Sequence, residues 1–385
     1  MSFQSRIGRH VSEASLEAYQ LLAGRYPSFV TARRAAPLVD EIPVFVFHSI
    51  EPNEFETQLR YLSSNGYQTI DCDTFLRAIT GEIPLPEKAV MLTIDDGRAS
   101  VWTYGFPLLK KYGMTAVIFL IPGLIPEGGE LGPTLDDWPA ADLVDRDPGL
   151  MNWAEIRAMA DSGCADFQSH TLYHHKVPVS PEIVGVVTEK QAGALYDVPH
   201  VPCAADHVGE GYAQTLVGTP EFTSESLMSA PIMFRPDADF IDLCRKESVT
   251  EPAEMRYLAK AYKERHGAIG RFEDAAVTAR EIERSLRLSR EQIAEHLDKG
   301  PVRHLCYPYT IGTETSVRIS REAGYVTNFW GTLPGRRNNR PGTDPMHCAR
   351  LKGDFIFRLP GEGREELAQV FLKKLTRRMS GAPVY

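Results

Sequence analysis

The chain of 385 residues carries a net charge of −9, and 43% of its residues are hydrophobic while 24% are charged. This composition is typical of a globular protein that can bury one large core or two smaller ones. The acidic balance argues against nucleic acid or an anionic membrane surface as the main partner, because both require a concentrated basic surface.

Six cysteines lie far apart without a CxxC pair, so neither a zinc ribbon nor a disulfide framework is indicated. We therefore expect free thiols in a reducing compartment. The N-terminal residues contain no apolar run long enough for a signal peptide, and no stretch of the chain reaches membrane-spanning length. These features predict a cytoplasmic protein without a membrane span.

Residues 1–40 are interpreted as an N-terminal helical extension with Leu16, Tyr19, Leu21 and Leu22 on its apolar side. From residue 41 onwards, short apolar runs alternate with helical patterns, which predicts βα units around a mostly parallel sheet. The predicted strands are 44–47, 90–94, 116–120, 165–168 and 304–307. The predicted helices include 100–112, 153–162 and a long helix marked by Ile282, Leu286, Ile293 and Leu297.

Residues 176–270 interrupt this alternation with a stretch much longer than a usual βα loop. We interpret the stretch as an insertion that forms a lid or wall of the site and sets substrate choice. Residues suited to sugar recognition occur within it, namely Tyr196, Tyr212, Phe222, Phe234, Arg235, Asp237 and Asp239. The alternative is a structural excursion whose aromatic residues pack only into its own small core.

Polar side chains follow the predicted strands where each of them ends: His48, Asp95, Asp96, His170 and Tyr309. In α/β barrels the active site is built at the C-terminal ends of the strands. These residues are therefore the candidates for one site.

The pair Asp95 and Asp96 comes before Gly97, which allows a sharp turn; the alternative is an Asp-Gly turn with both carboxylates in solvent. His170 and His174 are four residues apart, so they would share one face of a helix and could both reach a single ion. Two histidines with one carboxylate leave coordination positions open, as in catalytic metal sites. The combination of the two aspartates with the two histidines favours a catalytic metal site over a chance occurrence of these motifs.

These motifs resemble those of the polysaccharide deacetylases, the carbohydrate esterase family that includes the NodB chitooligosaccharide deacetylases. Residues 93–97 resemble the family's TFDDG motif, with Ile94 in place of phenylalanine, and residues 170–174 resemble its H-S/T-x-x-H motif. Residues 306–309 resemble the third motif in the form found among bacterial exopolysaccharide deacetylases, where YPYG is usual. The resemblance covers roughly residues 42–175 and 271–351.

The resemblance implies an α/β fold, a distorted (β/α) barrel of the NodB-homology type over residues 41–385. It implies a metal-dependent N-deacetylase that acts on an N-acetylated sugar or glycan. One divalent ion, usually zinc, would be held by Asp96, His170 and His174. Asp95 would be the general base, and the Tyr309 backbone N–H would help to hold the oxyanion.

The sequence departs from the family pattern at three places. Thr310 replaces the glycine that usually follows the third motif. The arginine that many members carry before the proline of that motif is absent, and Arg350 is a candidate to supply its charge. No late Leu-x-His segment is present, so the usual catalytic acid has no counterpart; His48 and His347 are the candidates, although a lone histidine at a strand end is often structural.

Two other functions are compatible with this sequence. One is a metal-dependent hydrolase of a non-sugar amide on the same barrel, since a fold does not determine a function. The other is a carbohydrate-binding barrel without turnover. A bound metal and acetate release from N-acetylglucosamine oligomers would separate the three functions.

Overall fold

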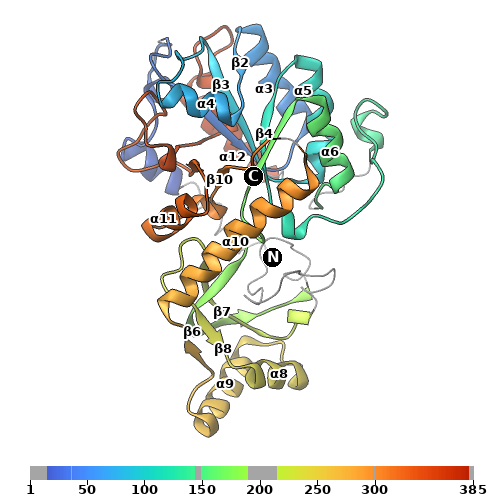
Figure 1. Ribbon diagram of the computed structural model, residues 1–385, viewed down its shortest axis with the longest axis vertical. Helices are drawn as coiled ribbons and strands as arrows, with labels where there is room; N and C mark the ends of the chain where they lie inside the picture. Colours follow the sequence, from blue (N-terminus) through green and yellow to red (C-terminus); the bar gives the residue numbers. More distant parts are fainter. Residues whose placement is uncertain (1–14, 36, 144–148, 190–214, 299, 381–385) are drawn as a thin grey trace. The chain divides into compact units, whose positions relative to one another are not determined.

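A computed structural model describes residues 15–35, 37–143, 149–189, 215–298 and 300–380 (Figure 1). The chain divides into two compact units. The first unit comprises Met1–Phe119, Pro126–Gln168 and Val326–Tyr385, and the second comprises Leu120–Ile125 and Ser169–Tyr325.

The main sheet has eight strands, ordered β11-β10-β5-β4-β3-β1-β12 with β2 beside β3. Its strands are β1 (Val44–Phe47), β2 (Gln68–Thr69), β3 (Ala89–Asp96), β4 (Ala116–Leu120), β5 (Ala165–Ser169), β10 (His304–Cys306), β11 (Thr327–Phe329) and β12 (Leu351–Lys352). Within the first unit, β1 pairs in parallel with both β3 and β12, and β2 pairs in parallel with β3. The predicted parallel strand pairing is thus confirmed, and the strands predicted at 44–47 and 116–120 have the observed bounds.

Helices of the first unit follow its strands. They are α2 (Ser28–Thr31), α3 (Pro52–Ser64), α4 (Cys72–Ile79), the π-helix η1 (Val101–Gly105), α5 (Phe106–Tyr112), η3 (Ala140–Asp142), α6 (Trp153–Ser162), η6 (Pro345–His347), η7 (Gly353–Arg358) and α12 (Leu367–Ser380). A capping box between Asn152 and Glu155 begins α6, and Gly163 ends it at φ 75°, where the left-handed conformation favours glycine. The helix predicted over 100–112 is instead the π-helical turn η1 followed by α5.

The helix over residues 15–22 does not bury the apolar side that the sequence suggested. Leu16 is 55% exposed and Leu22 is 88% exposed, whereas Glu17 is buried. The expectation about the apolar side is therefore wrong for these leucines, because an acidic residue faces the interior of the unit.

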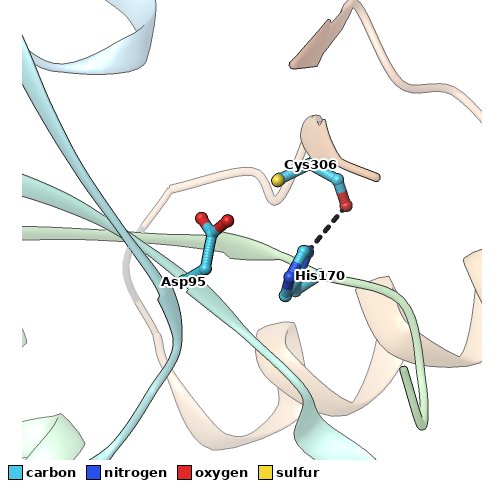
Figure 2. Close-up of side chains that lie close together, drawn as sticks. All are labelled: Asp95, His170 and Cys306. Atoms are coloured by element: carbon cyan, nitrogen blue, oxygen red, sulfur yellow. Dashed lines mark hydrogen bonds between the residues drawn. The ribbon is translucent and has the colours of Figure 1, made fainter. Parts of the chain in front are cut away.

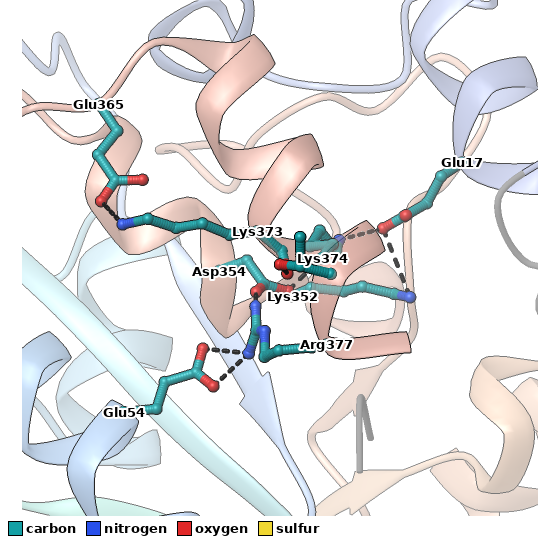
Figure 3. Close-up of polar contacts among 9 residues, drawn as sticks. Glu17, Glu54, Lys352, Asp354, Glu365, Lys373, Lys374 and Arg377 are labelled. Carbon is teal, nitrogen blue, oxygen red and sulfur yellow. Dashed lines mark hydrogen bonds and ion pairs between the residues drawn. The ribbon is translucent and has the colours of Figure 1, made fainter. Parts of the chain in front are cut away.

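A network of ion pairs surrounds the buried Glu17 (Figure 3). Its carboxylate pairs with Lys374 of α12 and lies 3.4 Å from the Nζ atom of Lys352. Lys374 lies 3.4 Å from Asp354, which also pairs with Arg377. Because a buried charge is costly unless it is paired, these contacts join the helix over 15–22 to α12 and to the segment after β12.

In the second unit, helices and short strands fill most of the chain. They are η2 (Pro122–Leu124), β6 (Lys176–Val186), β7 (Pro220–Ser226), β8 (Phe234–Pro236), α8 (Ala238–Glu247), α9 (Pro252–His266), β9 (Gly270–Phe272), α10 (Ala275–His296), η5 (Pro308–Thr310) and α11 (Glu314–Glu322). Two antiparallel pairs, β6 with β7 and β8 with β9, fall within or at the end of the predicted insertion. The boundaries of that insertion stay a prediction.

The insertion has a hydrophobic core of its own, which includes Phe222, Phe234, Phe240 and Tyr262. The Phe222 and Phe234 ring centroids are 5.6 Å apart, and both side chains are buried. Stacking of these two rings on a sugar is thus a wrong expectation, because they fill the core, which is the alternative given above. Among the other candidates, Arg235 pairs with Glu273 and Asp237 caps α8, while Tyr196 and Tyr212 lie outside the described residues.

Within the residues that the structure describes, the state of the cysteines and the hydropathy of the helices agree with the expectations. Cys72, Cys164, Cys244, Cys306 and Cys348 are free thiols, and Cys203 lies outside the described residues. Among the described helices, none combines the length and the apolar character that crossing a membrane requires.

We predict that Lys374→Met loosens the N-terminal helix, because Glu17 then loses the nearer of its two lysine partners, Lys374 and Lys352. Loss of one partner of a buried ion pair commonly costs about 3–5 kcal/mol of unfolding free energy. Limited proteolysis should show faster cleavage within residues 15–35. The matched control is Lys373→Met, whose lysine is 59% exposed and pairs with Glu365, and which should change stability by less than about 1 kcal/mol. Equal effects of the two variants would contradict the prediction.

Candidate active site

Asp95 and Asp96 are the last two residues of β3, every residue of which is buried. Asp96 has φ 73° and Gly97 has φ 77°, so two consecutive residues adopt the left-handed conformation. For a residue other than glycine this conformation costs roughly 1 kcal/mol or more. The turn ends the strict alternation of side chains along the strand, and the two carboxylates meet different arginines.

Arg350 holds the Asp95 carboxylate in a bidentate ion pair. Its Nη1 and Nη2 atoms lie 2.6 Å and 2.8 Å from the two Asp95 oxygens, and the Arg350 side chain is fully buried. The guanidinium also donates to the Thr93 hydroxyl at 3.2 Å and to the Trp330 carbonyl at 3.0 Å. The structure thus brings the Arg350 charge to Asp95, and its role as the replacement for the third-motif arginine stays a prediction.

Arg98 contacts the carboxylate of Asp96, and the sequence did not identify it as a candidate. Its Nε atom lies 2.9 Å from the Asp96 Oδ2 atom, and its Nη1 atom donates to the Ser49 hydroxyl at 2.9 Å. The signal in the sequence was its position directly after Gly97, where the turn folds the chain back toward the carboxylate. Asp96 thus meets Arg98 through one oxygen, in contrast to the bidentate contact at Asp95.

His48 follows β1, the parallel neighbour of β3. Its Nε2 atom lies 3.8 Å from the Asp95 Oδ2 atom, and its side chain is 24% exposed. Burial lowers the pKa of His48, and the nearby carboxylates of Asp96 and Asp95 oppose that shift. The structure thus brings His48 beside Asp95, and its role as the catalytic acid stays a prediction.

His347, the other candidate acid, lies in a different setting. Its Nδ1 atom is 2.8 Å from the Asp344 carboxylate, and its ring stacks on Trp330 with centroids 5.4 Å apart. Burial alone would raise the pKa of Asp344, but hydrogen bonds from His347 and from the Met346 backbone N–H outweigh it and lower the pKa. These contacts are those of a structural histidine.

The segment bearing His170 and His174 is not helical, so the helical arrangement that the spacing suggested is wrong. Thr171 and His174 have φ values of 69° and 53°, and the Thr171 hydroxyl accepts a hydrogen bond from the His174 N–H at 3.2 Å. This compact loop still places the two imidazole centroids 4.8 Å apart. The loop, rather than a helix, brings the two rings together, and the helical periodicity of the sequence could not predict it.

His170 is oriented by the third motif (Figure 2). Its Nδ1 atom lies 2.8 Å from the Cys306 carbonyl oxygen. Because a carbonyl oxygen only accepts, Nδ1 carries the proton and Nε2 keeps the lone pair that a metal requires. This is the arrangement of a histidine prepared for coordination.

Tyr309 and Thr310 both adopt the left-handed conformation, with φ 56° and 60°. This conformation explains why glycine is usual at the second position, because a β-branched threonine pays a steric penalty there. The Tyr309 ring lies 4.6 Å from the His174 ring, centroid to centroid, and the Lys176 Nζ atom lies 4.7 Å from the Tyr309 centroid. The tyrosine thus packs on a predicted ligand, and the role of its N–H at an oxyanion stays a prediction.

By residue type, two sets of side chains could hold an ion: Asp96 with His170 and His174, and Asp95 with His170 and Cys306. The first set is preferable for a cation, because both oxygens of Asp95 already face the positive charge of Arg350. The first set contains the three ligands predicted from the sequence, and their assignment stays a prediction.

Comparison with known proteins identifies the surrounding segment. Residues 82–193 match the family model described as polysaccharide deacetylase. Over 129 residues the chain is 33% identical to the poly-beta-1,6-N-acetyl-D-glucosamine N-deacetylase of Escherichia coli, an alignment that covers 34% of this chain and 18% of that protein. A Staphylococcus aureus protein of the same name is 23% identical over 130 residues, which cover 34% of this chain and 39% of the relative. The chain therefore spans less than half the length of either relative.

A likeness in three dimensions extends further along the chain. The deacetylase domain of BpsB from Bordetella bronchiseptica has a TM-score of 0.52 and 19% sequence identity, and the match covers 82% of this chain and 97% of that domain. This likeness confirms the predicted fold class, a distorted (β/α) barrel of the NodB-homology type.

We predict that Arg350→Met lowers the free energy of unfolding by about 3–5 kcal/mol, because the buried Asp95 loses its counterion. The double variant Asp95→Leu with Arg350→Met removes both charges and should regain much of that loss. Urea denaturation of the wild type, Arg350→Met, Asp95→Leu and the double variant measures the difference. A double variant as unstable as the sum of the single variants would show that the pair is not coupled.

Proposed function

Since this chain carries a polysaccharide deacetylase domain, we propose that it is a metal-dependent N-deacetylase of an N-acetylated glycan. The names of the two relatives suggest a substrate that contains N-acetylglucosamine, with a β-1,6 linkage as the first to test. Zinc is the first ion to test, because one carboxylate and two imidazoles suit it.

The observation that carries this proposal is that the neighbouring carboxylates of Asp95 and Asp96 have different contacts. Arg350 contacts both oxygens of Asp95, whereas Arg98 contacts the Asp96 carboxylate through one oxygen. A general base must lie close to the ion without coordinating it, whereas a ligand must point a lone pair at the ion. The two environments support one carboxylate for each role.

An amide resists hydrolysis because its carbonyl is weakly electrophilic and its amine is a poor leaving group. A divalent ion bound by Asp96, His170 and His174 would supply Lewis acidity to the carbonyl and lower the pKa of water at the site. Asp95 would accept the proton of the attacking water, because each carboxylate oxygen keeps a second lone pair beside its hydrogen bond to Arg350.

The remaining steps fall to Tyr309 and His48. The Tyr309 N–H would donate to the developing oxyanion, a type of contact commonly worth about 3 kcal/mol of transition-state stabilisation. We propose His48 as the residue that protonates the amine, since it lies beside Asp95 whereas His347 contacts Asp344 and Trp330. Burial disfavours the charged form of the His48 imidazole, which favours transfer of its proton to the amine.

We predict that the purified chain binds about one divalent ion and that His174→Ala loses most of it. The matched control is His175→Ala, which removes the adjacent and equally buried histidine, whose ring faces Tyr173 at 6.0 Å. Elemental analysis of the three proteins measures the metal content directly. Equal metal in both variants would rule out His174 as a ligand.

The activity itself is tested by acetate release from β-1,6-linked N-acetylglucosamine oligomers. We predict that Asp95→Asn reduces turnover by at least about a hundredfold while the metal content survives, because an amide cannot accept the water proton. Asp96→Asn should instead lose the metal as well as the activity. If Asp95→Asn kept more than roughly a tenth of wild-type turnover, another residue would be the principal base. Absence of acetate release from the metal-loaded wild type would reject the proposed function.

A further inference from the structure

The first unit contains an open groove of about 570 Å³ that the proposed chemistry does not use. Trp102, Phe106 and Lys110 line it, together with residues 131–134 and 136–138. The first three belong to η1 and α5, which follow directly after the turn at Asp96 and Gly97.

Aromatic side chains dominate the groove. Trp102 and Phe106 are nearly buried, and their rings stack with centroids 5.2 Å apart at an angle of 21°. Trp138, which also lines the groove, is 58% exposed. The groove therefore offers a fixed aromatic floor and an uncovered tryptophan.

The segment that carries Trp138 is held in place by hydrogen bonds. The Trp102 indole donates to the Gly132 carbonyl at 2.7 Å, and the Leu135 N–H donates to the Thr103 carbonyl at 3.0 Å. Asp137 accepts hydrogen bonds from the Thr134 backbone N–H at 2.9 Å and the Thr134 hydroxyl at 3.1 Å. A surface ordered in this way loses little conformational entropy when a ligand binds.

The charged residues of this segment are all acidic. Residues 126–142 contain Glu127, Glu130, Asp136, Asp137 and Asp142, and no lysine or arginine. Lys110 is the lysine that lines the groove, and it pairs with Asp136 at 2.6 Å. The charged residues that line the groove are thus Asp136, Asp137 and Lys110, which gives its lining a net negative charge.

We propose that this groove binds an amino-sugar unit whose acetyl group has already been removed. The C–H face of a pyranose packs on an aromatic ring, while its ammonium is attracted by the acidic segment and by the face of Trp138. The inference rests on the proposed function, because that reaction converts neutral N-acetyl units into cationic ones. A groove of this kind keeps a partly deacetylated chain on the protein and makes such a chain the preferred substrate.

The test is calorimetric binding of a β-1,6-linked glucosamine tetrasaccharide and of its fully N-acetylated form. Both are measured on the Asp95→Asn background, which blocks turnover of the acetylated sugar. The amino form should bind at least several times more tightly, and the preference should shrink at high salt because it is electrostatic. Trp138→Ala should weaken binding of the amino form by roughly tenfold, while Trp138→Phe should retain most of it.

Two further variants separate charge from stacking. Asp137→Asn keeps the acceptor for Thr134 and removes one charge, so it should weaken the amino form alone. Tyr257→Ala removes another aromatic ring, 76% exposed on α9, and should leave binding unchanged. Equal affinity for the two sugars, or wild-type affinity in Trp138→Ala, overturns the proposal. Because the assay needs no turnover, its result is independent of the acetate-release test.

Discussion

The buried pair of Asp95 and Arg350 is the interaction on which the rest of the site depends. It joins the end of β3 to the residue before β12, positions separated by 255 residues in the sequence. A buried ion pair adds little net stability, because desolvation offsets its Coulomb attraction. Its value here is orientation: the bidentate fork holds Asp95 in one rotamer, and the parallel strands β3, β1 and β12 support it.

Backbone strain recurs at the residues of the candidate site. Asp96, His174, Tyr309 and Thr310 are residues other than glycine with positive φ. Each of these conformations costs on the order of 1 kcal/mol or more and persists only where the surroundings impose it. The fully buried strand β3 and the contact of the Tyr309 ring with His174 supply that constraint. These strained backbone conformations thus help to orient the carboxylates and imidazoles of the candidate site.

Two aromatic residues of the inserted segment do not stack on a sugar, although the sequence suggested it. Phe222 and Phe234 are buried in a core that also contains Phe240, and the role of the segment as a lid or wall stays a prediction. An exposed tryptophan with acidic neighbours lies instead at Trp138 of the first unit. Burial rather than residue type decides which aromatic side chains remain available to a ligand.

Local pattern in the sequence was sufficient for β1, β4 and α6, whose predicted bounds agree with the structure, because strand and helix periodicity and capping act over a few residues. It also selected the residue types of the candidate metal site. The αL turn at Asp96, the contact of Arg98 with it and the bidentate grip of Arg350 were decided only by tertiary structure. A side chain 255 residues away in the sequence leaves no periodic signal beside Asp95, and only packing determines which charge lies next to it.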